Sequence, residues 1–196
     1  PRKLDKYFNK NSLKYIGKAK EECNILVRKG INQNSKYSFL EAICSLTNTT
    51  CENYLDKLIQ FLTPDIFVSL NNSEIFKYFH EDSDYTQNLD EFLNWCLFYK
   101  DNISKFKYNI IKEISKKTYK KKNCIKDIQT NPNIRHLYNI YVSMENYKKY
   151  ICDLNIYKDY NLLIDLLSRK SELNIFILDD TKKNNIKLLN PLNDDI

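Results

Sequence analysis

Apolar residues recur at three- and four-residue spacing over most of this chain, and the period changes to that of a strand only close to its C-terminal end. The runs at 38–47 and 51–62 each place their apolar positions on one helical face. Runs at 103–122 and 134–151 have the same period. Stripes of this kind are buried when helices pack together. The sequence therefore predicts a mainly helical domain.

The change of period comes after residue 172. Residues 173–178 and 186–189 are short apolar segments on either side of a polar turn, so they predict an antiparallel hairpin. Two strands alone are marginal in water, and 23–27 is the segment that would supply a third. The predicted fold class is α+β, mainly α: a helical domain with a small C-terminal antiparallel β-hairpin or three-stranded sheet.

Helix starts are marked by capping residues. Ser38 and Glu41 have the spacing of a capping box. Thr63 is a good N-cap before Pro64, because proline suits the first helical position. Asn72 or Ser73 is expected to begin a short helix, and 162–167 a last one. A densely apolar helix after Asn88 is expected to be largely buried through Phe92, Leu93, Trp95, Cys96, Leu97, Phe98 and Tyr99.

The organisation of the chain follows from length and composition. With 196 residues it suits one or two domains. Residues 1–22 are basic with sparse apolar positions, and we expect a peripheral lead-in segment there. Residues 23–196 are expected to form a single mainly helical domain, excised from a longer protein because the chain lacks an initiator methionine. The sequence contains no run of eighteen apolar residues, so it predicts no transmembrane helix.

The residues that usually carry catalysis are scarce. His80 and His136 are the two histidines, and neither stands beside a nucleophile or in a metal-ligand spacing. Gly17 and Gly30 are isolated, so no phosphate-binding glycine loop is present. The six cysteines contain no closely spaced pair, which argues against a structural zinc site. We expect no enzyme activity, no catalytic or metal-binding residues and no cofactor.

A run of lysines is the strongest candidate for a binding site. The formal net charge is +6, and seven lysines crowd fifteen residues: Lys112, Lys116, Lys117, Lys120, Lys121, Lys122 and Lys126. On a continuing helix, Lys112, Lys116 and Lys120 would share a face and could follow a phosphate backbone. A solvated helix end is the alternative. Because lysine recognises phosphate less specifically than arginine, such contacts would position DNA rather than read its sequence.

A second basic candidate precedes the first predicted helix. Arg28 and Lys29 stand at the end of a strand-like segment, followed by Gly30 and a polar turn. Together with the amides at the helix start they could meet a phosphate. Alternatively, Gly30 makes a turn that the fold needs and Arg28 pairs with an acid such as Glu41.

The tyrosines are also open to two interpretations. Tyrosine is favoured at interfaces because it buries apolar area while keeping a polar tip. A protein-docking surface is one interpretation, and boundary positions of a helical domain the other, for Tyr138, Tyr141, Tyr147, Tyr150, Tyr157 and Tyr160.

Several short motifs occur in an order that resembles a known family. The first two are Ile25-Leu26-Val27-Arg28-Lys29-Gly30-Ile31 and Tyr37-Ser38-Phe39-Leu40. The next two are Leu62-Thr63-Pro64-Asp65-Ile66-Phe67 and Asn71-Asn72-Ser73-Glu74-Ile75-Phe76. The last cover 160–167, 173–178 and 188–193. This series is similar to segments of the large subunits of viral early transcription factors from nucleocytoplasmic large DNA viruses. It departs from them at Asn190, where the family has cysteine, and 80–158 matches none of its motifs.

The resemblance implies a non-enzymatic domain of a viral transcription initiation factor. Such a domain would contribute to promoter DNA binding, to docking on the ATPase (helicase-like) small subunit and the viral RNA polymerase, or to both. ATP hydrolysis would belong to the other subunit. The implied location is the virion and the viral factory in the host cytoplasm, with no membrane partner. The Arg28-x-Gly30 element is part of the match.

An interpretation from another class remains open. The abundance of Tyr, Asn, Lys and Ile can result from the base composition of an AT-rich genome as readily as from a function. The chain could be a helical interaction module of an exported or surface protein from an AT-rich parasite. Its cysteines would then pair, whereas free thiols favour a reducing compartment.

Overall fold

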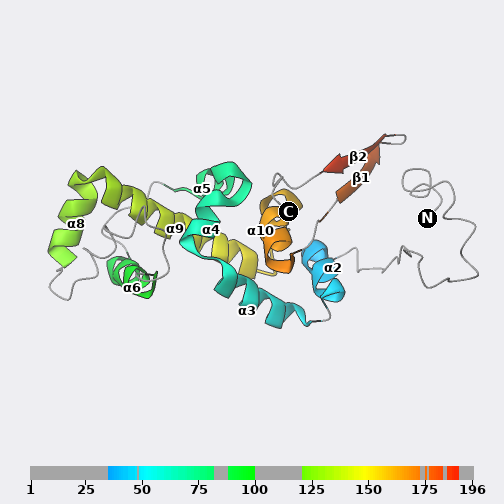
Figure 1. Ribbon diagram of the computed structural model, residues 1–196, viewed down its shortest axis with the longest axis horizontal. Helices are drawn as coiled ribbons and strands as arrows, with labels where there is room; N and C mark the ends of the chain where they lie inside the picture. Colours follow the sequence, from blue (N-terminus) through cyan, green and yellow to red (C-terminus); the bar gives the residue numbers. More distant parts are fainter. Residues whose placement is uncertain are drawn as a thin grey trace, which may run out of the picture. The chain divides into compact units, whose positions relative to one another are not determined.

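The computed structural model describes residues 35–47, 49–81, 88–99, 121–172, 175, 177–182 and 185–189, and within these ranges the side chains of 121–123 and of the two strands are not described. The backbone divides into two units, 1–30 and 31–196, and every described residue belongs to the second (Figure 1). The predicted lead-in segment and the strand-like segment at 23–27 lie outside the described residues.

The first two described helices confirm the predicted runs, with one correction at a cap. Helix α2 is Ser38–Leu46 and helix α3 is Cys51–Phe61. The N-cap of α2 is Tyr37, which makes no side-chain cap bond, so the predicted capping box of Ser38 and Glu41 is wrong. The helix begins one residue earlier than the box requires, and the amide of Glu41 donates to the carbonyl of Tyr37 at 3.1 Å.

Helix α4, Pro64–Ser69, begins as predicted. The hydroxyl of Thr63 accepts from the amide of Ile66 at 3.3 Å, and Pro64 occupies the first turn. A 3₁₀ segment, η2 (Leu70–Ser73), then joins α4 to α5 (Glu74–Tyr78). Ser73 is the N-cap of α5, as one of the two predicted starts, with φ 72°; its hydroxyl caps no amide of the helix and donates instead to the carbonyl of Val68 at 2.8 Å.

Helix α6, Leu89–Tyr99, is amphipathic rather than buried on all sides. Phe92, Trp95, Cys96 and Tyr99 point inward as predicted, whereas Leu97 and Phe98 are 45% and 70% exposed. The expectation that α6 is largely buried is therefore wrong. Among the described elements, α6 packs against α8 and α9, and these neighbours cover only part of its surface.

The remaining helices are α8 (Lys121–Thr130), α9 (Pro132–Cys152) and α10 (Tyr160–Ser171). Helix α8 extends past the predicted end of the 103–122 helix, and α10 is longer than the predicted 162–167. Asn131 caps α9 by accepting from the amide of Asn133 at 3.0 Å, next to Pro132 in the first turn. Asp159 caps α10 by accepting from the amide of Asn161 at 2.9 Å.

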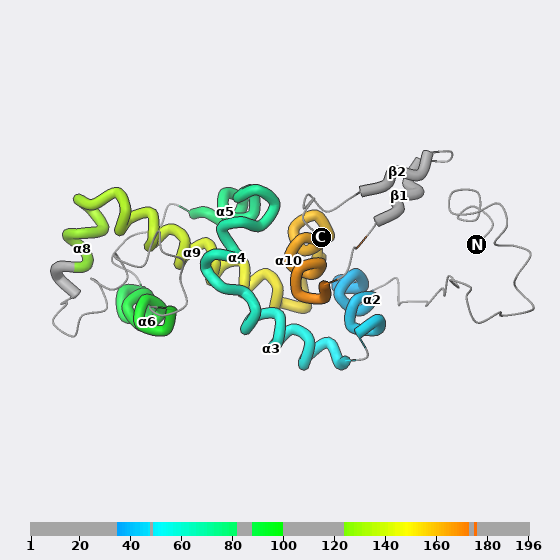
Figure 2. Tube along the Cα trace, viewed as in Figure 1, coloured from blue at the N-terminus to red at the C-terminus, as the bar shows by residue number. Residues whose placement is uncertain are grey.

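Helix α9 is the longest of the described helices, and its course can be followed in Figure 1 and Figure 2. It packs against α3, α4, α5, α6 and α8. Its inward aromatic rings meet rings from α4 and α6: Phe67 lies 5.7 Å from Tyr147, and Phe92 lies 5.1 Å from Tyr138, between ring centroids. The mainly helical character predicted from the sequence is thus confirmed.

Two strands follow α10 along the chain. β1 (Ile177–Lys182) and β2 (Asn185–Leu189) pair antiparallel, with Ile177 opposite Leu189. The register is irregular between Asp179 and Lys182. The first strand begins later than the predicted 173–178. None of the helices within the described ranges has the length and apolar character that crossing a membrane requires.

Candidate functional site

Most of the predicted basic site lies outside the described residues. This holds for Arg28, Lys29, Lys112, Lys116, Lys117 and Lys120. Lys121 and Lys122 are placed at the beginning of α8, but their side chains are not described. Lys126 is exposed one helical turn after Lys122. The DNA-contact assignment of these residues therefore stays a prediction.

The two arginines among the described residues are engaged within the fold. Arg135 donates from Nε to the carbonyl of Ile128 at 3.1 Å and from a terminal nitrogen to that of Gln129, so it satisfies carbonyls near the end of α8. Arg169 pairs with Asp165, with Nε 2.8 Å from the carboxylate. The Arg135 contacts join α9 to the end of α8, whereas the Arg169 pair lies within α10.

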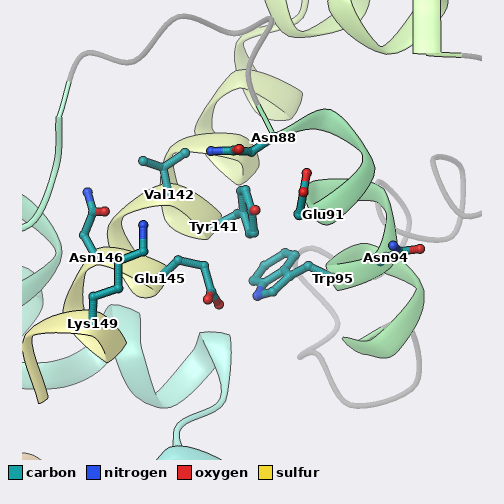
Figure 3. Close-up of a pocket in the computed structure, with 9 residues that line it drawn as sticks. All are labelled: Asn88, Glu91, Asn94, Trp95, Tyr141, Val142, Glu145, Asn146 and Lys149. Carbon is teal, nitrogen blue, oxygen red and sulfur yellow. The ribbon is translucent and has the colours of Figure 1, made fainter. Parts of the chain in front are cut away.

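A cleft lies between α6 and α9 (Figure 3). Its volume is about 460 Å³, and it is partly open to solvent. Two aromatic rings, two carboxylates and several amides meet there. The lining residues are Asn88, Glu91, Asn94, Trp95, Tyr141, Val142, Glu145, Asn146 and Lys149.

The aromatic wall of the cleft comes from both helices. Trp95 on α6 and Tyr141 on α9 have ring centroids 5.7 Å apart at an angle of 63°. Their apolar faces belong to the core, since each residue is only 6% exposed. The indole Nε1 of Trp95 is buried and has no hydrogen-bond acceptor among the described residues. An unsatisfied buried donor of this kind costs free energy.

The acidic wall is formed by Glu91 and Glu145. Burial raises the pKa of the Tyr141 phenol, and the charges of Glu145 and then Glu91 raise this pKa further. Glu145 points toward the Trp95 indole in Figure 3, and its carboxylate also pairs with Lys148 at 2.7 Å. The pair is partly shielded, because the Glu145 and Lys148 side chains are 35% and 18% exposed.

A second polar cluster holds a strained turn. Asn71, Asn72 and Ser73 have successive positive φ angles of 45°, 53° and 72°. Left-handed backbone is unfavourable for residues with a Cβ, so the turn requires support. The amide of Asn71 donates to buried Asp165 at 2.8 Å, and its side chain donates to the carbonyl of Asn161 at 2.9 Å. The cluster is a structural support for this turn.

Lys158 is a buried cation that no pattern in the sequence singles out. It is only 3% exposed, and its ammonium donates to the carbonyls of Tyr150 and Asp153 at the end of α9. The same ammonium lies 4.6 Å from the centre of the Tyr150 ring. Burial lowers the pKa of Lys158, against the opposite effect of Asp153. Its backbone amide donates to the carbonyl of Lys36 at 2.9 Å, and Lys36 Nζ donates to the carbonyl of Asn155 at 2.7 Å.

The histidines and cysteines are the remaining side chains that commonly take part in catalysis or bind metal ions. His80 and His136 both contact Phe76, with ring centroids 5.8 and 5.7 Å away. All five cysteines of the described ranges carry free thiols: Cys44, Cys51, Cys96, Cys124 and Cys152. Within those ranges, no group of three or more histidine, cysteine or acidic side chains is placed to hold a metal ion.

The six tyrosines do not form one surface. Tyr138, Tyr141 and Tyr147 are buried in the core, whereas Tyr157 is 73% exposed. The prediction that all six form a docking surface is therefore wrong, because three of them face α4, α5 and α6 from the inner side of α9. Near Tyr157, Leu154 and Ile156 are also exposed.

Sequence reasoning did not find the cleft, because its acids come from helices some fifty residues apart in the chain. Asn88, before α6, has φ 58°, and its carbonyl accepts from the amide of Phe92 at 2.9 Å. In comparisons with protein-family models, curated proteins and solved structures, nothing matches this chain.

Proposed function

We propose that this chain is a non-enzymatic domain of the large subunit of a viral early transcription factor. It would contribute to promoter DNA binding, to docking on the ATPase subunit and the viral RNA polymerase, or to both, in the virion and the viral factory. The ordered series of motifs from Ile25 to Asn193 supports this proposal. The 80–158 region has no counterpart among those motifs, so its role is proposed from its own residues.

The observation that carries the DNA-binding part is the lysine run leading into α8. Lys122 and the exposed Lys126 are four residues apart within this helix, a spacing that places two side chains on one face. Lysines on one face can neutralise successive phosphates, and each neutralised phosphate releases counterions. Binding would therefore be steeply salt-dependent and would show little sequence preference.

The predicted third strand of the sheet also belongs to this proposal. The strand pair β1–β2 would gain a third strand from 23–27, giving a small sheet beside the helices. Arg28 and Lys29 would then stand at the end of that strand. This arrangement would offer a second phosphate-binding position next to the helix start at Ser38.

Fluorescence anisotropy on an AT-rich duplex across a salt series tests the proposal. One variant reverses the charge of Lys116, Lys117, Lys120, Lys121 and Lys122. The expected result is salt-steep binding by the wild-type protein, with the slope of log K against log salt reduced by roughly one for each phosphate that the variant no longer neutralises. Lys57→Glu, at an exposed position of α3, is the control and should change the slope little.

Two results decide against DNA contact through the lysine run. If the wild-type protein binds no duplex at low salt, this domain does not contact DNA by itself. If the charge-reversal variant binds as tightly as the Lys57→Glu control, the lysine run is a solvated helix end. In the first case the remaining proposal is docking, tested by co-purification with the ATPase subunit and the polymerase; in the second, the DNA contact would fall to Arg28 and Lys29.

A further inference from the structure

Two cysteines meet at the turn between α2 and α3. Cys44 lies in the last turn of α2, and Cys51 is the first residue of α3. The two helices pack against each other, and the side chains of the two cysteines are hydrogen-bonding partners. Both are free thiols in the structure. Because a disulfide forms only between side chains that lie close together and point at each other, this pair is placed for one.

Hydrogen bonds of the turn bring the two thiols together. The amide of Thr49 donates to the carbonyl of Cys44 at 3.3 Å. The hydroxyl of Thr47 donates to the same carbonyl at 3.1 Å and lies 3.1 Å from the hydroxyl of Thr49. Thr50 then caps α3 through its side chain. The chain has therefore turned back onto Cys44 just before Cys51 begins the next helix.

The two thiols differ in access to solvent. Cys44 is only 3% exposed, whereas Cys51 is half-buried. Burial, followed by the hydrogen bond with Cys51 and the charge of that thiol, raises the pKa of Cys44 to about 12, so Cys44 keeps its proton at neutral pH. A reagent from solvent would therefore meet Cys51 first, and Cys44 would be the second thiol to react.

We infer that Cys44 and Cys51 are a reversible redox pair, which forms an intramolecular disulfide when a small-molecule disulfide such as glutathione disulfide is in excess. Cys51, as the thiolate, attacks one sulfur of glutathione disulfide, which forms a mixed disulfide and releases one glutathione thiolate. Cys44 then loses its proton and attacks the Cys51 sulfur, which forms the Cys44–Cys51 bond and releases the second glutathione. The two protons and two electrons lost by the cysteines end on the two glutathione thiols.

The bond would fasten α2 to α3 by closing the ring of residues 44–51. In a reducing compartment the pair remains as two thiols, as in the structure. The inference goes beyond the proposed function and does not rest on DNA binding. It also differs from a general pairing of the cysteines, because it concerns these two thiols alone.

The test uses the full chain with Cys23→Ser and Cys152→Ser, which prevents pairing between molecules through the exposed Cys152. The protein is equilibrated under nitrogen in buffers of glutathione and glutathione disulfide, quenched with acid, and alkylated in denaturant. Trypsin then releases 37–57 as one peptide, because no lysine or arginine lies between Lys36 and Lys57. The disulfide form of this peptide escapes alkylation and is lighter by two hydrogen atoms, so mass spectrometry gives the equilibrium constant of the pair.

The same measurement in concentrated urea separates the effect of the fold from that of the short spacing. The equilibrium constant for disulfide formation in the native protein should be at least about tenfold larger than in the unfolded chain, because the native turn already holds the two thiols together. Cys44→Ser should accumulate a mixed disulfide with glutathione at Cys51, which the parent protein resolves. Cys96 and Cys124, both fully buried, are the internal controls and should stay thiols in the native protein.

Four results would overturn the inference. The first is a 37–57 peptide that stays doubly alkylated in excess glutathione disulfide. The second is an equilibrium constant in the native protein no larger than in urea. The third is as much mixed disulfide at Cys51 in the parent protein as in Cys44→Ser. The fourth is equal oxidation of Cys96 and Cys124, which would show that opening of the whole fold, and not this turn, exposes the thiols.

Discussion

The carboxylate of Asp165 accepts a hydrogen bond of 2.8 Å from the backbone amide of Asn71, although the two residues are 94 positions apart in the chain. Arg169 donates to the same carboxylate from Nε at 2.8 Å and from a terminal nitrogen at 3.2 Å. It also donates to the hydroxyl of Ser69 at 2.7 Å. One buried ion pair on α10 therefore holds both the end of α4 and the turn that follows it.

Removing this carboxylate should be costly. Asp165→Ala leaves a partly buried guanidinium and the Asn71 amide without their acceptor, so we expect the free energy of unfolding to fall by about 3–5 kcal/mol. Asp165→Asn keeps one acceptor and should lose less. Urea denaturation measures both variants. Glu74→Ala breaks an ion pair whose side chains are about two-thirds exposed, and it should cost at most about 1 kcal/mol; an equal loss in Asp165→Ala would contradict the assignment.

The left-handed turn gives a second prediction. Asn72 is exposed with φ 53°, a conformation that glycine adopts freely and a β-branched residue resists. Asn72→Val should lower the free energy of unfolding by about 1–2 kcal/mol, whereas Asn72→Gly should be neutral or slightly stabilising. Thermal unfolding checks the order. Asn53→Gly on the exposed side of α3 should instead destabilise by a few tenths of a kcal/mol, because that residue is helical.

Alkaline pH should unfold the protein through its buried thiols. Burial, and next the charge of Asp127, raises the pKa of Cys124 from 9.0 to about 11. Burial raises the pKa of Cys44 to about 12. Unfolded thiols lose their protons first, so the stabilisation is fully present below pH 9 and is lost as the pH rises through the folded pKa. Lys158, whose pKa burial lowers, acts in the opposite sense below its ordinary value of 10.5.

Denaturant titrations at a series of pH values from neutral to about 11 measure this loss. Cys124→Ala removes one titrating thiol at a fully buried position, so its stability should fall less steeply between about pH 9 and 11 than that of the wild-type protein. Asn53→Gly, which removes no titrating group, is the control. Parallel pH profiles for the two variants would show that the Cys124 thiol does not contribute.

Thiol reactivity distinguishes the two classes of function. Cys152 is exposed, and Cys44, Cys96 and Cys124 are buried. In a Cys23→Ser background, a thiol reagent should modify Cys152 quickly and the three buried thiols only on unfolding. Cys152→Ser should remove the fast phase. Denatured wild-type protein from its native source should titrate as six free thiols; paired cysteines there would favour the exported interaction module.

The sequence predicted where the helices form better than it predicted how far each helix is buried. The inward positions of α6 were correct at Phe92, Trp95 and Cys96, because a stripe at helical spacing must face the core. Leu97 and Phe98 were misjudged, since the spacing of apolar residues does not reveal how many neighbours a helix has. The cap at Thr63 was correct because it depends on adjacent residues alone.

The sites depend on contacts that no local pattern encodes. Glu91 and Glu145 share a cleft only because α6 packs on α9. Lys158 is buried because its ammonium reaches the last carbonyls of α9, although its neighbours Tyr157 and Asp159 are exposed. Asp165 and Arg169 have the spacing of a helical ion pair, which the sequence does show. Its burial against the turn at Asn71 required the tertiary structure.

The two contacts of Lys36 set a limit on how far the chain can be trimmed. A fragment beginning at Ser35 retains the carbonyl that accepts from Lys158, the ammonium that reaches Asn155, and the hydroxyl of Ser35 that accepts from the amide of Tyr37. A fragment beginning at Ser38 retains none of them. Loss of these contacts would expose the loop between α9 and α10 to proteolysis, although the truncated end of the fragment lies more than a hundred residues before that loop in the chain.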